Sequence, residues 1–185
     1  FSPLAGTFFA AVERSVLAWR ARDGALCAQH HHVVDARAGD ITAMALDDRE
    51  RKIIVGTQNG YVQVLNAENG APLRGVRRHG ACVSAVLYNG PDKCIVTASW
   101  DRRVHVHDDQ EYDPGEAPPY APPLRCVRAA HAEDVTCCAL SHPLGLVATG
   151  SSDFSVRVWD FQFGAFEGAC AGAHGHKAEV TSLAF

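Results

Sequence analysis

The sequence has little of what several large protein classes require. It contains one methionine, and no apolar run approaches the roughly 20 residues that span a bilayer. No signal peptide is visible and the first residue is Phe1, so we expect an internal segment of a longer chain. The net charge of -4 over 185 residues gives none of the basic field that nucleic-acid binders use. The apolar fraction of 47% is too high for a disordered acidic tail.

The cysteines also lack the number and spacing that disulfide frameworks and zinc sites need. The seven cysteines are an odd number, and none of them forms a C-x-x-C pair. A secreted disulfide framework favours an even count, and zinc sites need paired ligands at short spacing. The run His30–His32 does not indicate a metal site either, because adjacent residues of a strand point to opposite faces. We expect buried thiols in a reducing compartment, no metal and no cofactor.

What the sequence does contain is a repeat. Short segments in which apolar and polar residues alternate recur along the chain, and this pattern is typical of half-buried strands. One set ends at residues 46, 88, 140 and 185, and Phe1 fits the same phase, so the spacings are 45, 42, 52 and 45 residues. A period of about 40–50 residues with four strands predicts propeller blades rather than a sandwich. The expected repeats are about 1–45, 46–87, 88–139 and 140–184.

The fourth repeat carries the most specific motifs. His131 stands four residues before Val135, the run Leu146–Asp153 follows, and Val156–Asp160 ends in Trp-Asp. In these motifs the sequence resembles the WD40-repeat β-propeller family, and the resemblance covers the whole chain. It implies an all-β fold, namely a segment of about four four-stranded blades that is part of a larger propeller. In the last full repeat, counted from its first strand, we expect strands at about 135–141, 145–150, 155–160 and 165–170.

The resemblance also implies a hydrogen-bonded network inside each well-formed blade. The residues assigned to it are His131, Thr149, Asp153 and Trp159 in the fourth repeat, and His79, Thr97 and Asp101 in the third, where His107 replaces the tryptophan. A histidine, a threonine and an aspartate together also resemble a nucleophile triad. A catalytic site has no reason to recur with the period of a blade, whereas a structural network does. We therefore expect a structural network and no enzyme activity.

Residues 109–123 form an insertion between the third and fourth strands of the third repeat. From Asp108 to Glu116 the sequence has five acidic residues and no basic one. A calcium loop is rejected because Pro114 and Tyr120 stand where that loop needs glycine and glutamate. The expectation is a solvated linker on the bottom face of the propeller, with one P-x-x-P motif.

Turn residues on the opposite, top face are the candidates for partner binding. Tryptophan and arginine often carry the energy of protein interfaces. Trp100 and Gln58 occupy the same position in successive turns, Arg102 follows Trp100 closely, and Phe154 lies in the next turn. We expect Trp100, Arg102, Phe154 and Gln58 to contact a protein partner.

A weaker resemblance concerns the assembly. The segments Thr97–Val104, His131–Val135 and Trp159–Phe161, together with the insertion, are similar to repeats of cilia- and flagella-associated WD-repeat proteins. This implies a non-enzymatic scaffold in a multi-subunit axonemal complex, located in the cytoplasm and in the cilium or flagellum. The expected partners are proteins, with no nucleic acid, membrane or small-molecule substrate.

Two alternatives stay open. One is a substrate receptor of a ubiquitin ligase, although Gln162 stands where the Trp-Asp-x-Arg motif of such receptors has its arginine. The other is a reader of phosphopeptides or histone tails. Arg102 and Arg103 are only two arginines for phosphate, and acidic residues such as Asp134 at the entrances of the first strands suit a basic peptide better.

Overall fold

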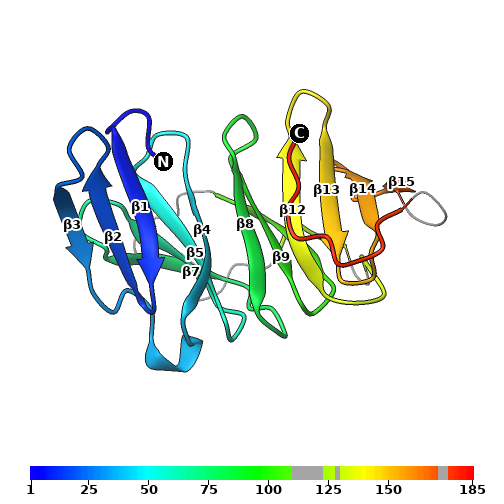
Figure 1. Cartoon of the computed structure of the whole chain (residues 1–185), viewed down its shortest axis with the longest axis horizontal. Helices are drawn as coiled ribbons and strands as arrows, with labels where there is room; N and C mark the ends of the chain where they lie inside the picture. Colours follow the sequence, from blue (N-terminus) through cyan, green and yellow to red (C-terminus); the bar gives the residue numbers. More distant parts are fainter. Residues whose placement is uncertain (110–122, 128–129, 171–174) are drawn as a thin grey trace.

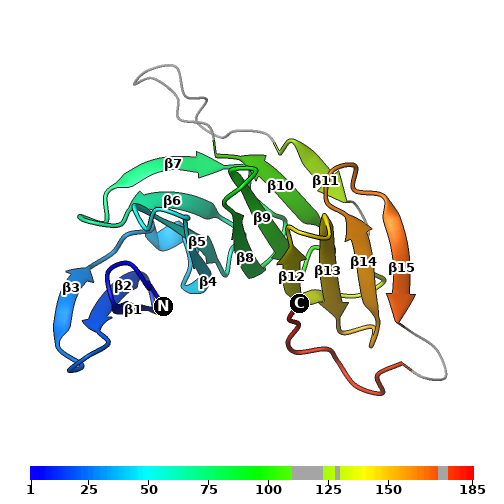
Figure 2. The same cartoon turned by 90° about the horizontal axis from the view of Figure 1, so that it is seen from above.

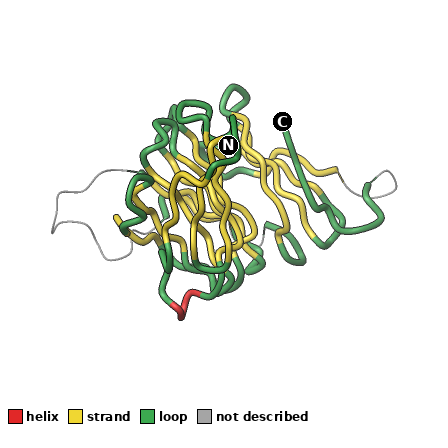
Figure 3. Tube along the Cα trace, turned by 60° about the vertical axis from the view of Figure 1, so that its left-hand side comes forward, coloured by secondary structure: helices red, strands yellow, loops and turns green. Residues whose placement is uncertain are grey.

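The computed structural model describes residues 1–109, 123–127, 130–170 and 175–185. In this part of the chain the strands form four separate antiparallel sheets that stand side by side (Figure 1). Seen from above, the sheets fan out as an open arc (Figure 2). The helical structure in the same residues is one 3-10 turn at Ala36–Ala38, which is red in Figure 3. The expected all-β fold is confirmed.

The first sheet has three strands and each of the others has four, in chain order. The first contains β1 (Thr7–Val12), β2 (Ser15–Arg20) and β3 (Leu26–His30). The second contains β4 (Ile41–Leu46), β5 (Lys52–Thr57), β6 (Val62–Asn66) and β7 (Pro72–Val76). The third contains β8 (Val83–Asn89), β9 (Cys94–Ser99), β10 (Val104–Asp108) and β11 (Arg125–Val127). The fourth contains β12 (Val135–Ser141), β13 (Leu146–Ser151), β14 (Val156–Asp160) and β15 (Phe166–Cys170).

Each sheet is arranged as a propeller blade. The first strands β4, β8 and β12 line the concave side of the arc, and the last strands β7, β11 and β15 lie on its convex side (Figure 2). We call the top face the end with the turns between the second and third strands and the loops between sheets, which is the lower side of Figure 1. The opposite end is the bottom face.

Apolar side chains pack neighbouring blades face to face. Ile53, Ile95 and Val147 hold the same register position in the second strands of the last three blades. Each pairs with the equivalent residue of the third strand, namely Leu65, His107 and Trp159. Ile53 and Ile95 are fully buried and Val147 is 3% exposed. Strand alternation sends these residues toward the preceding blade, and the next residue in each strand toward the following blade.

Hydroxyl groups join the blades on the concave side. Thr42 Oγ1 donates to the carbonyl of Val83 over 2.7 Å. Ser84 Oγ donates to the carbonyl of Val135 over 2.5 Å, and Thr136 Oγ1 makes the same bond to Val180. Each hydroxyl belongs to the second residue of a first strand, so the contact recurs once per blade.

We expected a strand at residues 180–185, and this expectation is wrong. No strand among the described residues pairs with this segment, and the structure leaves it without regular structure. Val180 nevertheless takes the place that Val83 has two contacts earlier and Val135 has one contact earlier. A Cβ on Gly150 would lie 2.6 Å from Val180 Cγ1, and a Cβ on Gly56 would lie 2.4 Å from Val83 Cγ1. Glycine is required at both positions because the next chain segment approaches this closely.

The cysteines divide by strand position. All seven are free, and Cys82, Cys94, Cys137 and Cys138 are buried as expected. Cys27, Cys126 and Cys170 are exposed, which corrects the expectation for these three. They lie on β3, β11 and β15, the outermost strands of their sheets, which have a neighbouring strand on one side only. Within the described residues, no helix has the length and apolar character needed to cross a bilayer.

Candidate functional site

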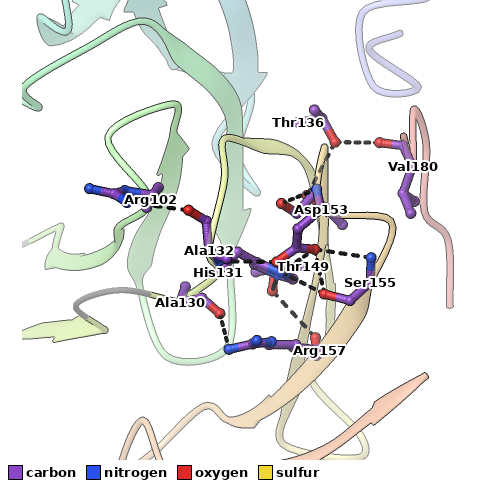
Figure 4. A network of polar contacts seen from close by, with 12 residues as sticks. Arg102, Ala130, His131, Ala132, Thr136, Thr149, Asp153, Ser155, Arg157 and Val180 are labelled. Atoms are coloured by element: carbon purple, nitrogen blue, oxygen red, sulfur yellow. Dashed lines mark hydrogen bonds and ion pairs between the residues drawn. The ribbon is translucent and has the colours of Figure 1, made fainter. Parts of the chain in front are cut away.

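Four side chains of the fourth blade form one chain of hydrogen bonds, and three of them, His131, Thr149 and Asp153, are labelled in Figure 4. Trp159 Nε1 donates to Thr149 Oγ1 over 2.9 Å, and Thr149 Oγ1 lies 2.7 Å from Nε2 of His131. The other ring nitrogen of His131, Nδ1, lies 3.2 Å from both carboxylate oxygens of Asp153. A neutral imidazole with its proton on Nδ1 satisfies every contact, since Nε2 then accepts from the threonine.

Asp153 also fixes the top-face turn. Its carboxylate accepts from the backbone N–H of Ala132 and of Ser155, each over 3.0 Å, and from the hydroxyl of Ser155. Burial alone would raise the pKa of this carboxyl, but the bonds from Ser155 and Ala132 outweigh it and lower the pKa to about 2. The network therefore ties the loop before β12 to the turn between β13 and β14.

The third blade forms a similar network without a tryptophan. His79 Nε2 lies 2.9 Å from Thr97 Oγ1, and His79 Nδ1 lies 3.1 Å from Asp101 Oδ2. Asp101 also accepts from the backbone N–H of Gly80 and of Arg103. Burial would raise the pKa of Asp101, yet the bonds from His79 and Gly80 lower it to about 2.

His107 does not take part in this network. It occupies the register position of Trp159, but neither of its ring nitrogens has a hydrogen-bond partner among the described residues. Its ring lies edge-on to His105, which stacks on His79 with centroids 4.1 Å apart. Burial lowers the pKa of His105 and of His107 to about 3, so both are neutral at pH 7.

The second blade has lost the network. Val55 stands at the threonine position and Leu65 at the tryptophan position, and both are fully buried. Asn59 replaces the aspartate, and its side-chain amide donates to the backbone carbonyl of Arg37 over 2.9 Å. This blade depends on apolar packing, as its sequence indicates.

The candidate binding residues lie on three neighbouring top-face turns. Trp100 N–H donates to the carbonyl of Cys82, and Gln58 N–H makes the equivalent bond to Asp40. Trp100 is 49% exposed and Phe154 is 46% exposed, and Gln58 is also exposed. Backbone hydrogen bonds thus hold each of these turns in place, and the side chains are exposed to solvent. Each blade contributes one such turn, so the exposed side chains do not form a single cluster.

Arg102 and Phe154 share an uncommon backbone conformation. Their φ angles are 65° and 66°, and Gly60 at the same turn position has a φ of 83°. Arg102 is exposed, but its Nη1 donates to the carbonyl of Ala132 over 3.2 Å, so it also joins the third blade to the loop before the fourth. Phe154 makes the same turn with an apolar side chain. A positive φ is uncommon for residues of this size.

A buried ion-pair cluster surrounds Asp109 on the bottom face, and no motif in the sequence predicts it. Asp109 is 6% exposed and accepts from Lys52 Nζ at 3.0 Å, Arg74 Nη2 at 2.9 Å and the Tyr88 hydroxyl at 2.9 Å. Burial and the Asp109 charge raise the pKa of Tyr88. We expected Asp109 to belong to a solvated linker, which is wrong because these three groups enclose its carboxylate. Residues 110–122 of the insertion, including the P-x-x-P motif, lie outside the described residues.

The partners of Asp109 explain why the sequence did not reveal it. They come from the second blade and from β8, between 21 and 57 residues away along the chain. No local motif marks such a contact. The hydroxyls on the concave side do carry a signal in the sequence. Thr42, Ser84, Thr136 and Thr181 recur at the same point of the repeat.

The geometry agrees with a comparison against known families. The family described as WD domain, G-beta repeat matches residues 70–108 and 124–160, which are most of the third and fourth blades. WD40 repeats are thus present in this chain.

Known WD40 proteins resemble this chain over parts of its length. "WD repeat-containing protein 37" of Mus musculus is 29% identical over 114 residues, which are 62% of this chain and 21% of the relative. "Cilia- and flagella-associated protein 337 B" of Tetrahymena thermophila is 22% identical over 82 residues, 44% of this chain and 6% of that protein. The chain thus spans about a fifth or less of these relatives.

Solved structures show the same fold. A chain in the crystal structure of the mitotic checkpoint complex has a TM-score of 0.77 and 21% identity, with 98% of this chain and 52% of that one covered. The computationally designed Ika8 protein has a TM-score of 0.70 and 23% identity, with 100% of this chain and 51% of that one covered. WD40 propellers are generally scaffolds for protein interactions and not catalysts. Among the described residues, no cluster of three His, Cys, Asp or Glu side chains could hold a metal ion.

Proposed function

We propose that this chain is the interaction-bearing part of a non-enzymatic scaffold, and that its top-face turns contact a protein partner. The observation that carries the proposal is the exposure of Trp100 on a turn whose backbone is fixed. Ser99 Oγ accepts from the N–H of Asp101, and the Asp101 carboxylate is bound by His79. A rigid turn loses little entropy on binding, which favours a tryptophan as an interface anchor.

We further propose that the assembly is an axonemal one. The support is the partial similarity to the Tetrahymena cilia- and flagella-associated protein, in agreement with the motifs Thr97–Val104 and His131–Val135. The chain is also similar to "Mitochondrial division protein 1" of Pyricularia oryzae, at 30% identity over half of this chain, so the axonemal proposal needs a direct test.

The test compares two exposed aromatic residues on opposite faces of neighbouring blades, one in the turn before β10 and one in the loop after β14. Trp100 lies on the top face, and Phe163, which is 77% exposed, lies on the bottom face. The full-length protein is tagged and expressed in ciliated cells with Trp100→Ala or Phe163→Ala, and axonemes are extracted with detergent. We expect Trp100→Ala to weaken retention by about 2 kcal/mol, or roughly thirtyfold in affinity, and Phe163→Ala to leave it unchanged.

The outcomes separate the two parts of the proposal. Absence of the unmodified protein from axonemes removes the axonemal part. Equal retention of both variants, with thermal melts equal to that of the unmodified protein, contradicts the role of Trp100 in partner binding. A large drop in melting temperature for Trp100→Ala would show that this side chain is part of the fold.

A further inference from the structure

The third blade presents a group of arginines on its top face. We call the arginine patch the exposed side chains of Arg77, Arg78, Arg102 and Arg103. The first two directly precede His79 and the last two directly follow Asp101. Because His79 Nδ1 lies 3.1 Å from Asp101 Oδ2, the blade network brings together two arginine pairs that are far apart in the sequence.

The charges of the patch are not neutralised within the described residues. None of the four arginines forms an ion pair with a carboxylate there. The acidic residue of the turn, Asp101, points inward and is bound by the ring of His79 and the backbone N–H groups of Gly80 and Arg103. The guanidinium groups therefore remain available for an external anion.

The fold does not require arginine at these positions. In the fourth blade the residues equivalent to Arg78, Arg102 and Arg103 are Ala130, Phe154 and Ser155, and that blade forms the complete network. An uncompensated cluster of like charges costs stability, so the structure alone gives no reason for it.

The guanidinium groups spread over three blades. Arg78 Nε donates to the carbonyl of Asn59, and its guanidinium lies 4.4 Å from the ring centre of Tyr61, both on the second blade. Arg102 reaches in the other direction, to Ala132 in the loop before the fourth blade. Arg77 and Arg103 are exposed and are the sequence neighbours of Arg78 and Arg102.

We propose that the arginine patch binds an acidic segment of the partner protein, a run of Glu and Asp side chains in an extended chain. This rests on the proposed function and names the chemistry of the partner at the same face. Arginine pairs with carboxylates through two parallel hydrogen bonds, and charges distributed over three blades fit a series of single charges better than one phosphate group. Trp100, half exposed on the same turn, supplies an apolar contact beside them.

The proposal is tested with a fluorescent peptide of ten glutamates and the full-length protein at about 50 mM salt, where screening is weak. The test variant is Arg77→Glu with Arg103→Glu, because neither side chain makes a hydrogen bond or ion pair with the described residues. The control is Arg22→Glu with Arg49→Glu, which changes the net charge equally but lies on the bottom face, in the loops after β2 and β4. We expect the test variant to weaken peptide binding at least about tenfold and the control less than about twofold.

Four results would overturn the proposal, and the first three concern the glutamate peptide. They are no binding of the glutamate peptide, equal loss in both variants, and binding of a single-stranded DNA of equal charge that matches the peptide in strength and in its dependence on Arg77 and Arg103. A singly phosphorylated peptide that binds more tightly than the glutamate peptide would overturn it as well. If these results occur while axonemal retention still depends on Trp100, the scaffold function stands and only the acidic chemistry of the partner is wrong.

Discussion

His107 takes the position of a signature tryptophan without its hydrogen bond. Trp159 in the fourth blade donates to Thr149, whereas the two nitrogens of His107 have no partner among the described residues. A buried polar group without a partner costs about 1–3 kcal/mol. The second blade shows the apolar solution at the same register position, where Leu65 is fully buried.

We therefore expect His107→Leu to stabilise the protein by about 1 kcal/mol at pH 7, because it removes the desolvated ring nitrogens. The same variant should reduce the sensitivity to acid. The folded-state pKa of His107 is about 3, below the ordinary value of 6.5, so the unfolded chain binds more protons between these limits. The free energy of unfolding is thus at its full value above about pH 6.5 and decreases as the pH falls toward 3. At pH 5 the protonation of His107 in the unfolded chain lowers it by about 2 kcal/mol.

The measurement is chemical unfolding of both proteins at pH 7 and pH 5. His31→Leu is the control, since His31 is exposed just beyond β3. A His107→Leu variant that loses as much stability between pH 7 and pH 5 as the unmodified protein would show that His107 is protonated in the folded blade.

At the scale of the element, the fourth blade behaves as one polar unit. Trp159, Thr149, His131 and Asp153 form a single chain of bonds from β14 to the loop before β12. We expect Thr149→Val and Asp153→Ala each to lower the free energy of unfolding by about 1–3 kcal/mol, with the larger effect for Asp153 because it also binds two backbone N–H groups. The double variant should lose less than the sum, since either change breaks the same chain.

A double-mutant cycle measures this coupling from chemical unfolding of the four proteins. Thr42→Val combined with Thr149→Val serves as the control, because Thr42 bonds to Val83 between other blades and the two effects should add. If the Thr149 and Asp153 effects are strictly additive, the network does not act as one unit.

The strands are the part of the fold that the sequence could predict. The expected strands of the fourth repeat, beginning with 135–141, agree within one residue with β12 to β15, because alternation and glycine-containing turns are local signals. Contacts between blades carry no such signal. The burial of Asp109 depends on residues up to 57 positions away, and the lack of partners for the ring nitrogens of His107 is visible only once the blade is folded.

At the scale of the whole molecule, the first sheet presents an apolar face against which no blade packs among the described residues, and the ring of Phe1 lies 4.8 Å from that of Phe8 on it. Phe8 pairs with Trp19 at the register position that Ile53, Ile95 and Val147 hold in the other sheets. Those three residues are buried between blades, whereas Phe8 is 51% exposed. Val12 and Leu26 on the same sheet are 49% and 53% exposed. The face that packs against a preceding blade elsewhere is open here, at one end of the arc in Figure 2.

An open blade face of this kind should make residues 1–185 associate when they are produced alone. Apolar patches beyond about 300–600 Å² are uncommon on monomers, because burying them is favourable by about 25 cal/mol per Å². Sedimentation velocity over a range of concentrations, together with binding of a hydrophobic dye, measures the association. Phe8→Asn should reduce both signals, whereas Phe163→Asn should not, since Phe163 is more exposed but lies on a bottom-face loop rather than on a blade face. A monodisperse monomer whose dye binding is unaffected by Phe8→Asn would show that this face is covered by the segment itself.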